Sequence, residues 1–414
     1  MKSIIKPSAL FLFMELFFHF SCKKDLLSFV EQNKPIVIQT TCLFQQTLIG
    51  TLPVYRYSIK MATAGNKIVF AGGWELSQGV GSIPSSRVDI FDLITQTWAD
   101  VDLNNHGGDV ATIAVEDKIY FAGGTAKDLN GDLSATVDIY NTTNNTWTST
   151  QLSEGRNGPI TLKAGNKILF GGGNSGQSTT VDIYDLLSSS WTTANLQHGL
   201  YSGSALGNKA VFESYTSFDI YDASTNNWSI YAINGSYYNM AEATLGNKIY
   251  FAGGYKGGYG SNQFSDVVHI YDIISNIWSA TKLSKPKTGM TAVSQGGKIF
   301  WAGGMDSIWY DLVPNEEYVR LVNDIEIYDL NAGSHSDHFF PQHTSFPRVG
   351  LANNQVLFTE GDSIHIYNSN LGTWTVCDAY LGWAPACISV GNKIYAAGRV
   401  GPSAENLMVW KLEF

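Results

Sequence analysis

The sequence predicts an all-β protein built from repeated four-stranded units, and three observations lead to this fold class. An aromatic residue is followed seven positions later by a tryptophan six times, and glycine doublets recur five times at the ends of short apolar segments. The 414 residues include 41 Gly, 21 Tyr, 21 Phe and 11 Trp, while only 15% are charged. This composition favours strands joined by tight turns and supplies aromatic area for a core.

One repeat unit can be written out from Ser58 onward. An alternating run of small residues predicts its first strand, and Gly65-Asn66 predicts the turn that reverses it, because such turns need positive φ. An apolar second strand then ends in Gly72-Gly73, and a variable polar loop follows. A third strand and a turn rich in Thr, Asn and Ser lead to a fourth strand that begins at Trp98. The first three expected strands are residues 58–63, 68–71 and 88–92.

The same pattern recurs along the chain with a period of 38–57 residues, which indicates a repeat architecture. Eight second strands can be aligned on the residue after the turn, at Lys67, Lys118, Lys167, Lys209, Lys248, Lys298, Gln355 and Lys393. The aromatic and tryptophan pairs that follow are Phe91/Trp98, Tyr140/Trp147, Tyr184/Trp191, Tyr221/Trp228, Tyr271/Trp278 and Tyr367/Trp374. The fourth and seventh units lack both the doublet and the long loop, so we expect a compact hairpin in each.

Repeated units of four antiparallel strands are the pattern of β-propeller blades, and we predict eight blades, with seven as the alternative. The eighth unit has only three expected strands, the last being Leu407 to Leu412. An open ring would leave blade edges unpaired. We therefore predict that residues 46–52 add the fourth strand to the last blade and close the ring.

The unit resembles the kelch repeat, which has a glycine doublet on its second strand and then an aromatic residue and a tryptophan separated by six residues. The resemblance covers residues 46–414 and implies a kelch-type β-propeller. Within such a scaffold the repeated acids Asp89, Asp138, Asp182 and Asp219 are expected to be structural, because an active site is needed only once per chain.

The N-terminus predicts export. A basic start and an apolar run of about a dozen residues are typical of a signal peptide over residues 1–21, and this run is too short to span a bilayer. The segment resembles Gram-negative lipoprotein signals, which implies lipidation of Cys22, a tether over residues 22–45, and an outer-membrane or cell-surface location, with a periplasmic or secreted protein as the alternative. We expect a monomer that contacts the membrane only through this lipid.

The net charge of −10 disfavours nucleic acid as a partner, because nucleic-acid affinity rests on basic residues that neutralise phosphates. Cys42, Cys377 and Cys387 allow at most one disulfide, and the sequence leaves the pairing open. Their spacing matches no zinc motif, and we predict neither a metal site nor a cofactor.

Binding is expected on the face that carries the loops between second and third strands and between units, because variable loops on a rigid scaffold usually carry function. Aromatic, acidic and basic side chains gather in these loops and suit sugar recognition. The candidate ligand-binding residues are Tyr55, Arg56, Arg156, Tyr201, Tyr237, Trp309, Tyr310, Glu316, Arg320, Arg348 and Trp383.

The sequence contains no nucleophile elbow, phosphate loop or zinc motif, so we assign no catalytic residue. The expected function is that of a non-enzymatic, surface-tethered propeller that binds a glycan or a protein through its variable loops. The alternative is a sugar mutarotase or epimerase resembling the sialic-acid-processing kelch proteins. Such an enzyme needs an acid/base pair and an arginine.

Overall fold

The computed structural model describes residues 44–77, 81–104, 106–126, 131–257, 263–310, 317–340, 347–360, 363–378, 381, 383–399 and 406–414. All of them belong to one unit, Gln39–Phe414. The predicted signal peptide, Cys22, Cys42 and most of the predicted tether lie outside the described residues. Strands and turns make up this part of the chain, and within it no helix is long and apolar enough to cross a membrane.

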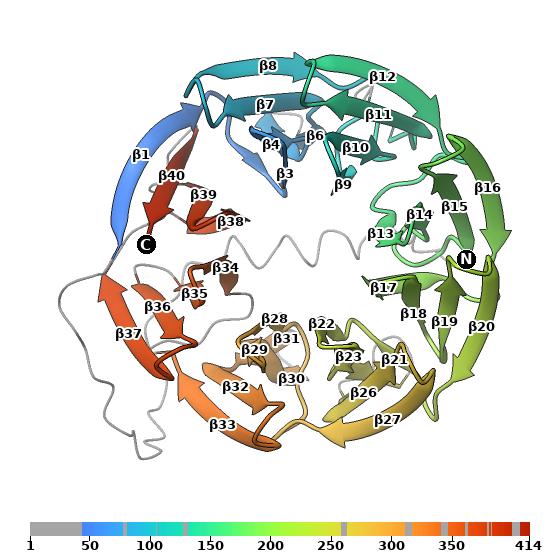
Figure 1. Ribbon diagram of the computed structural model, residues 1–414, viewed down its shortest axis with the longest axis vertical. Helices are drawn as coiled ribbons and strands as arrows, with labels where there is room; N and C mark the ends of the chain where they lie inside the picture. The colour runs from blue at the N-terminus through green and yellow to red at the C-terminus, as the bar shows by residue number, and fades with distance from the viewer. Residues whose placement is uncertain are drawn as a thin grey trace, which may run out of the picture. The chain divides into compact units, whose positions relative to one another are not determined.

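Eight four-stranded antiparallel sheets occur among the described residues, and they are called units 1 to 8 in chain order (Figure 1). Their first strands are β3 (Lys60–Ala64), β9 (Ala111–Val115), β13 (Ile160–Ala164), β17 (Leu200–Leu206), β22 (Ala241–Leu245), β28 (Thr291–Gln295), β34 (Arg348–Ala352) and β38 (Trp383–Val390). Their second strands are β4 (Lys67–Ala71), β10 (Lys118–Ala122), β14 (Lys167–Gly171), β18 (Lys209–Ser214), β23 (Lys248–Ala252), β29 (Lys298–Ala302), β35 (Gln355–Glu360) and β39 (Lys393–Arg399).

The third and fourth strands complete each sheet in the same order. The third strands are β7 (Arg87–Asp92), β11 (Thr136–Asn141), β15 (Thr180–Asp185), β19 (Ser217–Asp222), β26 (Val267–Asp272), β32 (Asp324–Asp329), β36 (Ser363–Asn368) and β40 (Leu407–Glu413). The fourth strands are β8 (Trp98–Asp102), β12 (Thr146–Gln151), β16 (Ser190–Asn195), β20 (Asn227–Ala232), β27 (Ile277–Lys282), β33 (Ser334–Phe339), β37 (Thr373–Asp378) and, for unit 8, β1 (Gln45–Leu52).

The fourth strand of unit 8 comes from the N-terminal side of the repeats. β1 runs antiparallel to β40, with Gln45 opposite Glu413 and Leu52 opposite Leu407, and the sheet order is β1-β40-β39-β38. The predicted pairing of residues 46–52 with the last strand is therefore present. First strands of successive units contact one another, and β38 contacts both β34 and β3.

The aromatic and tryptophan pairs hold the third and fourth strands together. In all six pairs the two residues lie directly opposite each other on neighbouring strands, as Tyr140 and Trp147 do with ring centroids 4.7 Å apart. Each core cluster then spans two neighbouring units; one joins Val69 and Val88 of unit 1 to Ile119 and Phe121 of unit 2. These contacts show that the repeated residues pack the strands of each unit together and join neighbouring units, which is a structural role.

The connections divide between two faces, because successive strands run in opposite directions. The hairpins between first and second strands and the turns between third and fourth strands form what we call the turn face. The loops between second and third strands and the connections between units form the loop face. Smaller sheets lie in these loops: β2 (Arg56–Tyr57) with β5 (Trp74–Ser77) and β6 (Gly81–Pro84), β21 (Tyr237–Tyr238) with β24 (Tyr255–Lys256) and β25 (Gln263–Phe264), and β30 (Met305–Tyr310) with β31 (Glu317–Leu321).

Candidate functional site

Four tyrosines gather on the loop face over units 4 and 5, and we call them the tyrosine cluster: Tyr201, Tyr215, Tyr238 and Tyr255. Tyr238 stacks on Tyr255 with ring centroids 4.8 Å apart and an angle of 7° between the planes. Tyr215 stacks on Tyr238 at 6.0 Å, and Tyr201 packs against both at 6.1 and 5.9 Å. Tyr201 is 41% exposed, while the other three rings are half-buried. The result is a partly solvent-facing aromatic surface.

The cluster forms where unit 4 departs from the repeat. The glycine doublet is absent there, and the predicted compact hairpin is present between β18 and β19. The Ser214 hydroxyl contacts the Ser217 carbonyl oxygen at 2.9 Å, which closes the hairpin tightly. Tyr215 stands at its tip and donates a hydrogen bond to the carbonyl oxygen of Gly257 at 2.8 Å. The short hairpin therefore leaves room on the face, and aromatic rings occupy it.

Two carboxylic acids lie beside the tyrosine cluster, at the seam between β18 of unit 4 and β22 of unit 5. Glu213 is fully buried, accepts a hydrogen bond from the Ser202 hydroxyl, and has no hydrogen-bond partner at its other oxygen. Burial, together with the nearby charge of Glu242, raises the pKa of Glu213 to about 8. Burial also raises the pKa of Glu242 to about 7. Both acids can thus hold or exchange a proton near neutral pH.

The β30–β31 hairpin of unit 6 adjoins this surface through unit 5, since the Tyr255 hydroxyl lies 3.8 Å from the Met305 sulfur. Trp309 and Tyr310 occupy β30 opposite Tyr318 and Glu317 of β31. Arg320 is exposed and donates two hydrogen bonds to Asp306, at 2.6 and 3.0 Å, which raises the pKa of its guanidinium. Glu316 lies outside the described residues. Three of the candidate residues thus share one hairpin next to the tyrosine cluster.

The predicted candidates Arg56 and Arg156 lie inside the fold. Arg56 is 1% exposed, pairs with Asp89, and donates hydrogen bonds to the carbonyl oxygens of Gly72 and Arg87 at 2.9 and 2.6 Å. Arg156 is fully buried between Asp182 and the carbonyl oxygen of Thr180, 2.8 Å away. Burial lowers the pKa of both guanidiniums. These interactions belong to the fold, so we leave both arginines out of the candidate site.

The same interaction recurs with other residues. His106 is buried and bonds Asp138 at 3.0 Å, and Lys287 is buried and bonds Asp324 at 2.7 Å. In each case the connection between two units sends a basic side chain to an acid at the start or middle of the next third strand. The predicted structural role of Asp89, Asp138 and Asp182 agrees with these contacts. Tyr237, another candidate, is 5% exposed and packs edge-on against His269 at 5.6 Å.

The remaining candidates belong to units 1, 7 and 8. The Arg399 guanidinium lies 4.5 Å from the centre of the Tyr55 ring, a cation–π contact, and the backbone of Trp383 pairs with Arg399. Arg348 is exposed at the start of β34. These residues belong to other units than the tyrosine cluster, so we treat them as a separate group on the loop face.

Metal ligands and thiols add no second site to the described part of the chain. No three His, Cys, Asp or Glu side chains in those ranges come together in a way that could hold a metal ion. Cys387 is a free thiol, and burial raises its pKa to about 12.

Sequence reasoning selected Tyr201 but missed Tyr215, Tyr255, Glu213 and Glu242. Tyr215 and Tyr255 both lie in connections between second and third strands, but in different units, so their spacing in the chain gives no sign that their rings meet on the same surface. Glu213 carried a usable signal, since it stands where four other units have an alanine and one has a glycine: Ala71, Ala122, Gly171, Ala252 and Ala302. A buried acid at a position of broken repetition is a candidate functional residue.

Comparison with known proteins supports the fold. The kelch motif family model matches residues 107–150 and 237–281. No curated protein matches the chain. Among solved structures, a computationally designed protein named Ika8 is similar, with a TM-score of 0.57 and 13% sequence identity over 88% of this chain and 99% of that one. The kelch motifs and the four-stranded antiparallel sheets are together consistent with a kelch β-propeller.

Proposed function

We propose that this kelch-repeat protein is a non-enzymatic, surface-tethered binder that takes a glycan or protein ligand on its loop face, with the tyrosine cluster at the centre of the site. Kelch propellers commonly serve in protein binding and are mostly non-enzymatic scaffolds. The lipid anchor at Cys22 and the outer-membrane or cell-surface location remain part of this proposal.

The observation that carries the proposal is the partly exposed tyrosine cluster above two carboxylic acids. A tyrosine offers a flat apolar ring for the CH face of a sugar and a hydroxyl for a hydrogen bond. Carboxyl groups accept hydrogen bonds from sugar hydroxyls. Because several partly exposed rings and two acids lie side by side at units 4 and 5, we place the ligand there.

The experiment is a glycan array followed by calorimetric titration of the full chain with the best sugar. Tyr201→Ala should weaken binding at least about tenfold, since a ring that stacks on a ligand contributes about 1 kcal/mol or more. Tyr231→Ala is the matched control, because Tyr231 is 37% exposed on the outer strand β20 and stacks on Trp278 and not on the tyrosine cluster. Equal loss in both variants, or no sugar binding at all, would contradict the glycan ligand and leave a protein ligand to be tested.

The alternative function is a sugar mutarotase or epimerase. Glu213 and Glu242 favour it, because an acid and a base whose pKa values lie near neutrality suit proton transfer at a sugar carbon or hydroxyl. Exchange NMR of candidate sugars with the full chain should detect faster interconversion if this alternative is right. Glu213→Gln should abolish that acceleration without weakening sugar binding more than about threefold.

A further inference from the structure

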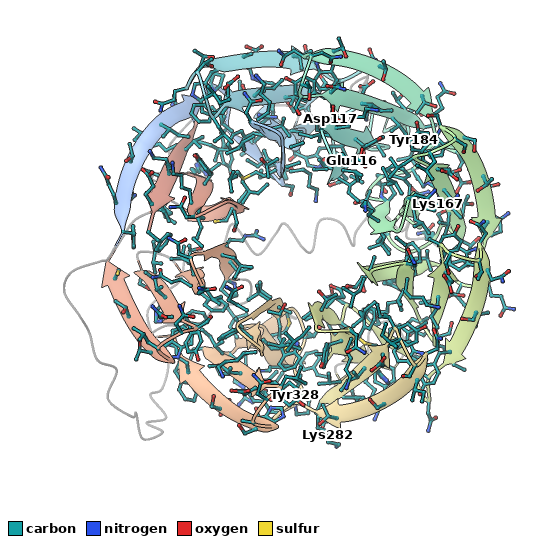
Figure 2. The ribbon with its side chains drawn as sticks, viewed as in Figure 1. Glu116, Asp117, Lys167, Tyr184, Lys282 and Tyr328 are labelled. Atoms are coloured by element: carbon teal, nitrogen blue, oxygen red, sulfur yellow. The ribbon has the colours of Figure 1, made fainter. Side chains whose placement is uncertain are left out.

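The turn face carries almost no charge at its tips. The seven turns between third and fourth strands include no Asp, Glu, Lys or Arg in residues 93–97, 142–146, 186–190, 223–227, 273–277, 330–334 and 369–373. Among the hairpins between first and second strands, Glu116-Asp117 is the charged exception, labelled in Figure 2. In a chain with a net charge of −10, this face can approach an apolar or zwitterionic surface without burying free charge.

Charges further from the tips are neutralised within the face. Lys67 pairs with Asp92, Lys167 with Asp185, and Lys209 with Asp222 at 2.8 Å. The hydrogen bond from the lysine lowers the pKa of Asp185 and of Asp222 to about 2. Each pair joins the start of a second strand to the end of a third strand, so the pattern repeats around the face (Lys167 is labelled in Figure 2).

Four large aliphatic side chains project from these turns. They are Ile94 at 77% exposure, Leu187 at 84%, Ile274 at 75% and Leu371 at 72%, the highest values of any large apolar residue in the described ranges. They belong to units 1, 3, 5 and 7, whose outer strands are β8, β16, β27 and β37 (Figure 1). Alternate units therefore carry one exposed aliphatic tip each.

Ile94, Leu187 and Ile274 occupy the same position of their turns, two residues after the aspartate, and Leu371 occupies the next position of its turn, three residues after Asn368. The Asp92 carboxylate accepts hydrogen bonds from the Ile94 and Thr95 backbone nitrogens at 2.8 and 3.0 Å, and Asp185 and Asp272 do the same in their turns. Asn368 accepts from Asn370 and Leu371 at 3.0 and 3.1 Å. Because the same hydrogen-bonded turn recurs, the four side chains project from the same edge of their units.

The N-terminal segment joins the propeller at this same face. β1 begins at Gln45, which lies opposite Glu413, and Glu413 lies opposite Lys393 at the start of a second strand. Asn353, in the hairpin of unit 7, donates a hydrogen bond to the Phe414 carbonyl oxygen at 3.1 Å. Phe44 and the start of β1 therefore lie at the turn face and not at the loop face.

We propose that the turn face rests on the lipid surface to which the chain is tethered, with Ile94, Leu187, Ile274 and Leu371 inserted at the interface and the loop face turned away from the membrane. This inference rests on the proposed tethering at Cys22. A flexible tether alone would leave the propeller free to rotate. Four apolar contacts on alternate units resist tilting in every direction, and burial of aliphatic side chains at the interface supplies the attraction.

The test is hydrogen exchange of the full chain, expressed in a Gram-negative host and reconstituted into vesicles of phosphatidylethanolamine and phosphatidylglycerol. Amides of residues 93–97, 186–190, 273–277 and 369–373 should exchange at least about tenfold more slowly on vesicles than in detergent. Residues 200–204 and 237–239 on the loop face should be unchanged. Leu187→Ser with Ile274→Ser should remove the protection from all four turns.

The matched control is Thr143→Ser with Ser224→Ala, which alters the same turn position in units 2 and 4 without removing an aliphatic side chain. In this control variant the amides of the four turns should exchange as slowly on vesicles as they do in the wild type. A chain retained on vesicles without protected turns, or with the loop face protected, would overturn the orientation and leave the tethering intact. A chain that never associates with vesicles would contradict both the proposed orientation and the proposed tethering. Protection that depends on protein concentration and not on lipid would instead identify a second copy as the occupant.

Discussion

At the scale of single residues, the fold depends on basic side chains that are buried against carboxylates. The guanidinium of Arg156 has no solvent exposure and is held by Asp182 and by the Thr180 carbonyl oxygen, with the half-exposed Glu154 3.7 Å away. Replacing a buried ion pair by apolar groups can be neutral, whereas removing one partner leaves a buried charge without compensation. The arginine is therefore a structural requirement of unit 3.

Arg156→Ala should lower the free energy of unfolding by about 3–5 kcal/mol, because Asp182 would remain buried and unpaired. Urea denaturation followed by tryptophan fluorescence measures the change. The double variant Arg156→Met with Asp182→Leu should recover more than half of the loss. If Arg156→Ala is as stable as the wild type, the pair contributes nothing and the arginine is again a candidate for ligand contact.

The acids Glu213 and Glu242 predict a pH dependence of stability. Burial holds their pKa values at about 8 and about 7 in the folded chain, above the ordinary range of a glutamate. The folded state therefore binds more protons than the unfolded state, so the stability contribution is present at low pH and is lost as the pH rises through 7 and 8. The buried histidines His269, His338 and His365 act in the opposite direction, because burial lowers their pKa values to about 4, 3 and 4 while the unfolded chain releases its histidine protons near pH 6.5. Their contribution to stability therefore grows as the pH rises towards and through about 6.5.

Relative to the variant Glu213→Gln with Glu242→Gln, the unfolding free energy of the wild type should fall between pH 6.5 and 8 by up to about 1.4 kcal/mol per pH unit for each acid. The histidines act equally in both proteins, so the difference between the two profiles reports on the two acids alone. A difference that does not change with pH would mean that the two acids are ionised in the folded state, and the alternative enzymatic function would lose its acid.

At the scale of single elements, glycine doublets let second strands end against the backbone of the next unit. Gly253 has φ of +72° and lies against the Lys287 carbonyl oxygen, with no room for a Cβ. Gly246, in the hairpin of the same unit, has a similar φ of +61° but open space around it. Substitutions at the two positions can therefore distinguish the free-energy cost of a positive φ from the free-energy cost of a clash with the backbone.

Gly246→Ala should therefore lower the unfolding free energy by about 1 kcal/mol, the cost of a left-handed conformation alone. Gly253→Ala should lower it by clearly more, about 2–4 kcal/mol, since a backbone carbonyl must move as well. Thermal and urea unfolding of the two variants give the comparison. Equal losses would show that the doublet is needed only for its dihedral angles.

Much of the structure of single strands and turns could be predicted from the sequence, because the repeat pattern marks where each strand and turn lies. The paired positions of Tyr140 and Trp147 and the compact hairpin at Glu213 follow from spacing alone. The direction of side chains in the connections between strands cannot be predicted from spacing. Arg56, His106 and Arg156 stand at intervals of 50 residues, which marks them as scaffold, yet in sequence they share the composition of a ligand-binding rim. The tyrosine cluster joins three separate connections, and only the packing of units 4 and 5 brings them together.

At the scale of the whole molecule, β1 joins the two ends of the repeat region. Leu52 is fully buried in a cluster with Ile68 and Phe70 of unit 1 and Val409 of unit 8. The Trp98 indole also donates a hydrogen bond to the Ile49 carbonyl oxygen at 3.3 Å. The strand therefore stabilises units 1 and 8 together.

A chain that begins at Pro53 should melt at least about 10 °C lower than the full chain and should self-associate, because β40 would present an unpaired edge. A synthetic peptide of residues 45–52 added in excess should restore the monomer and raise the melting temperature, while a scrambled peptide should not. Differential scanning calorimetry and light scattering provide the two measurements. An unchanged melting temperature would mean that unit 8 is stable with three strands.

The pairing of β1 with β40 also has a consequence for biogenesis. A ribosome adds about 5–20 residues per second, so the 355 positions from Leu52 to Leu407 correspond to roughly 20–70 s between the emergence of the two partners. During this interval one strand of unit 8 is exposed without its neighbour, next to units that can already fold. Export as an unfolded chain, with a holdase on the first strand, would keep that edge from pairing with the wrong unit.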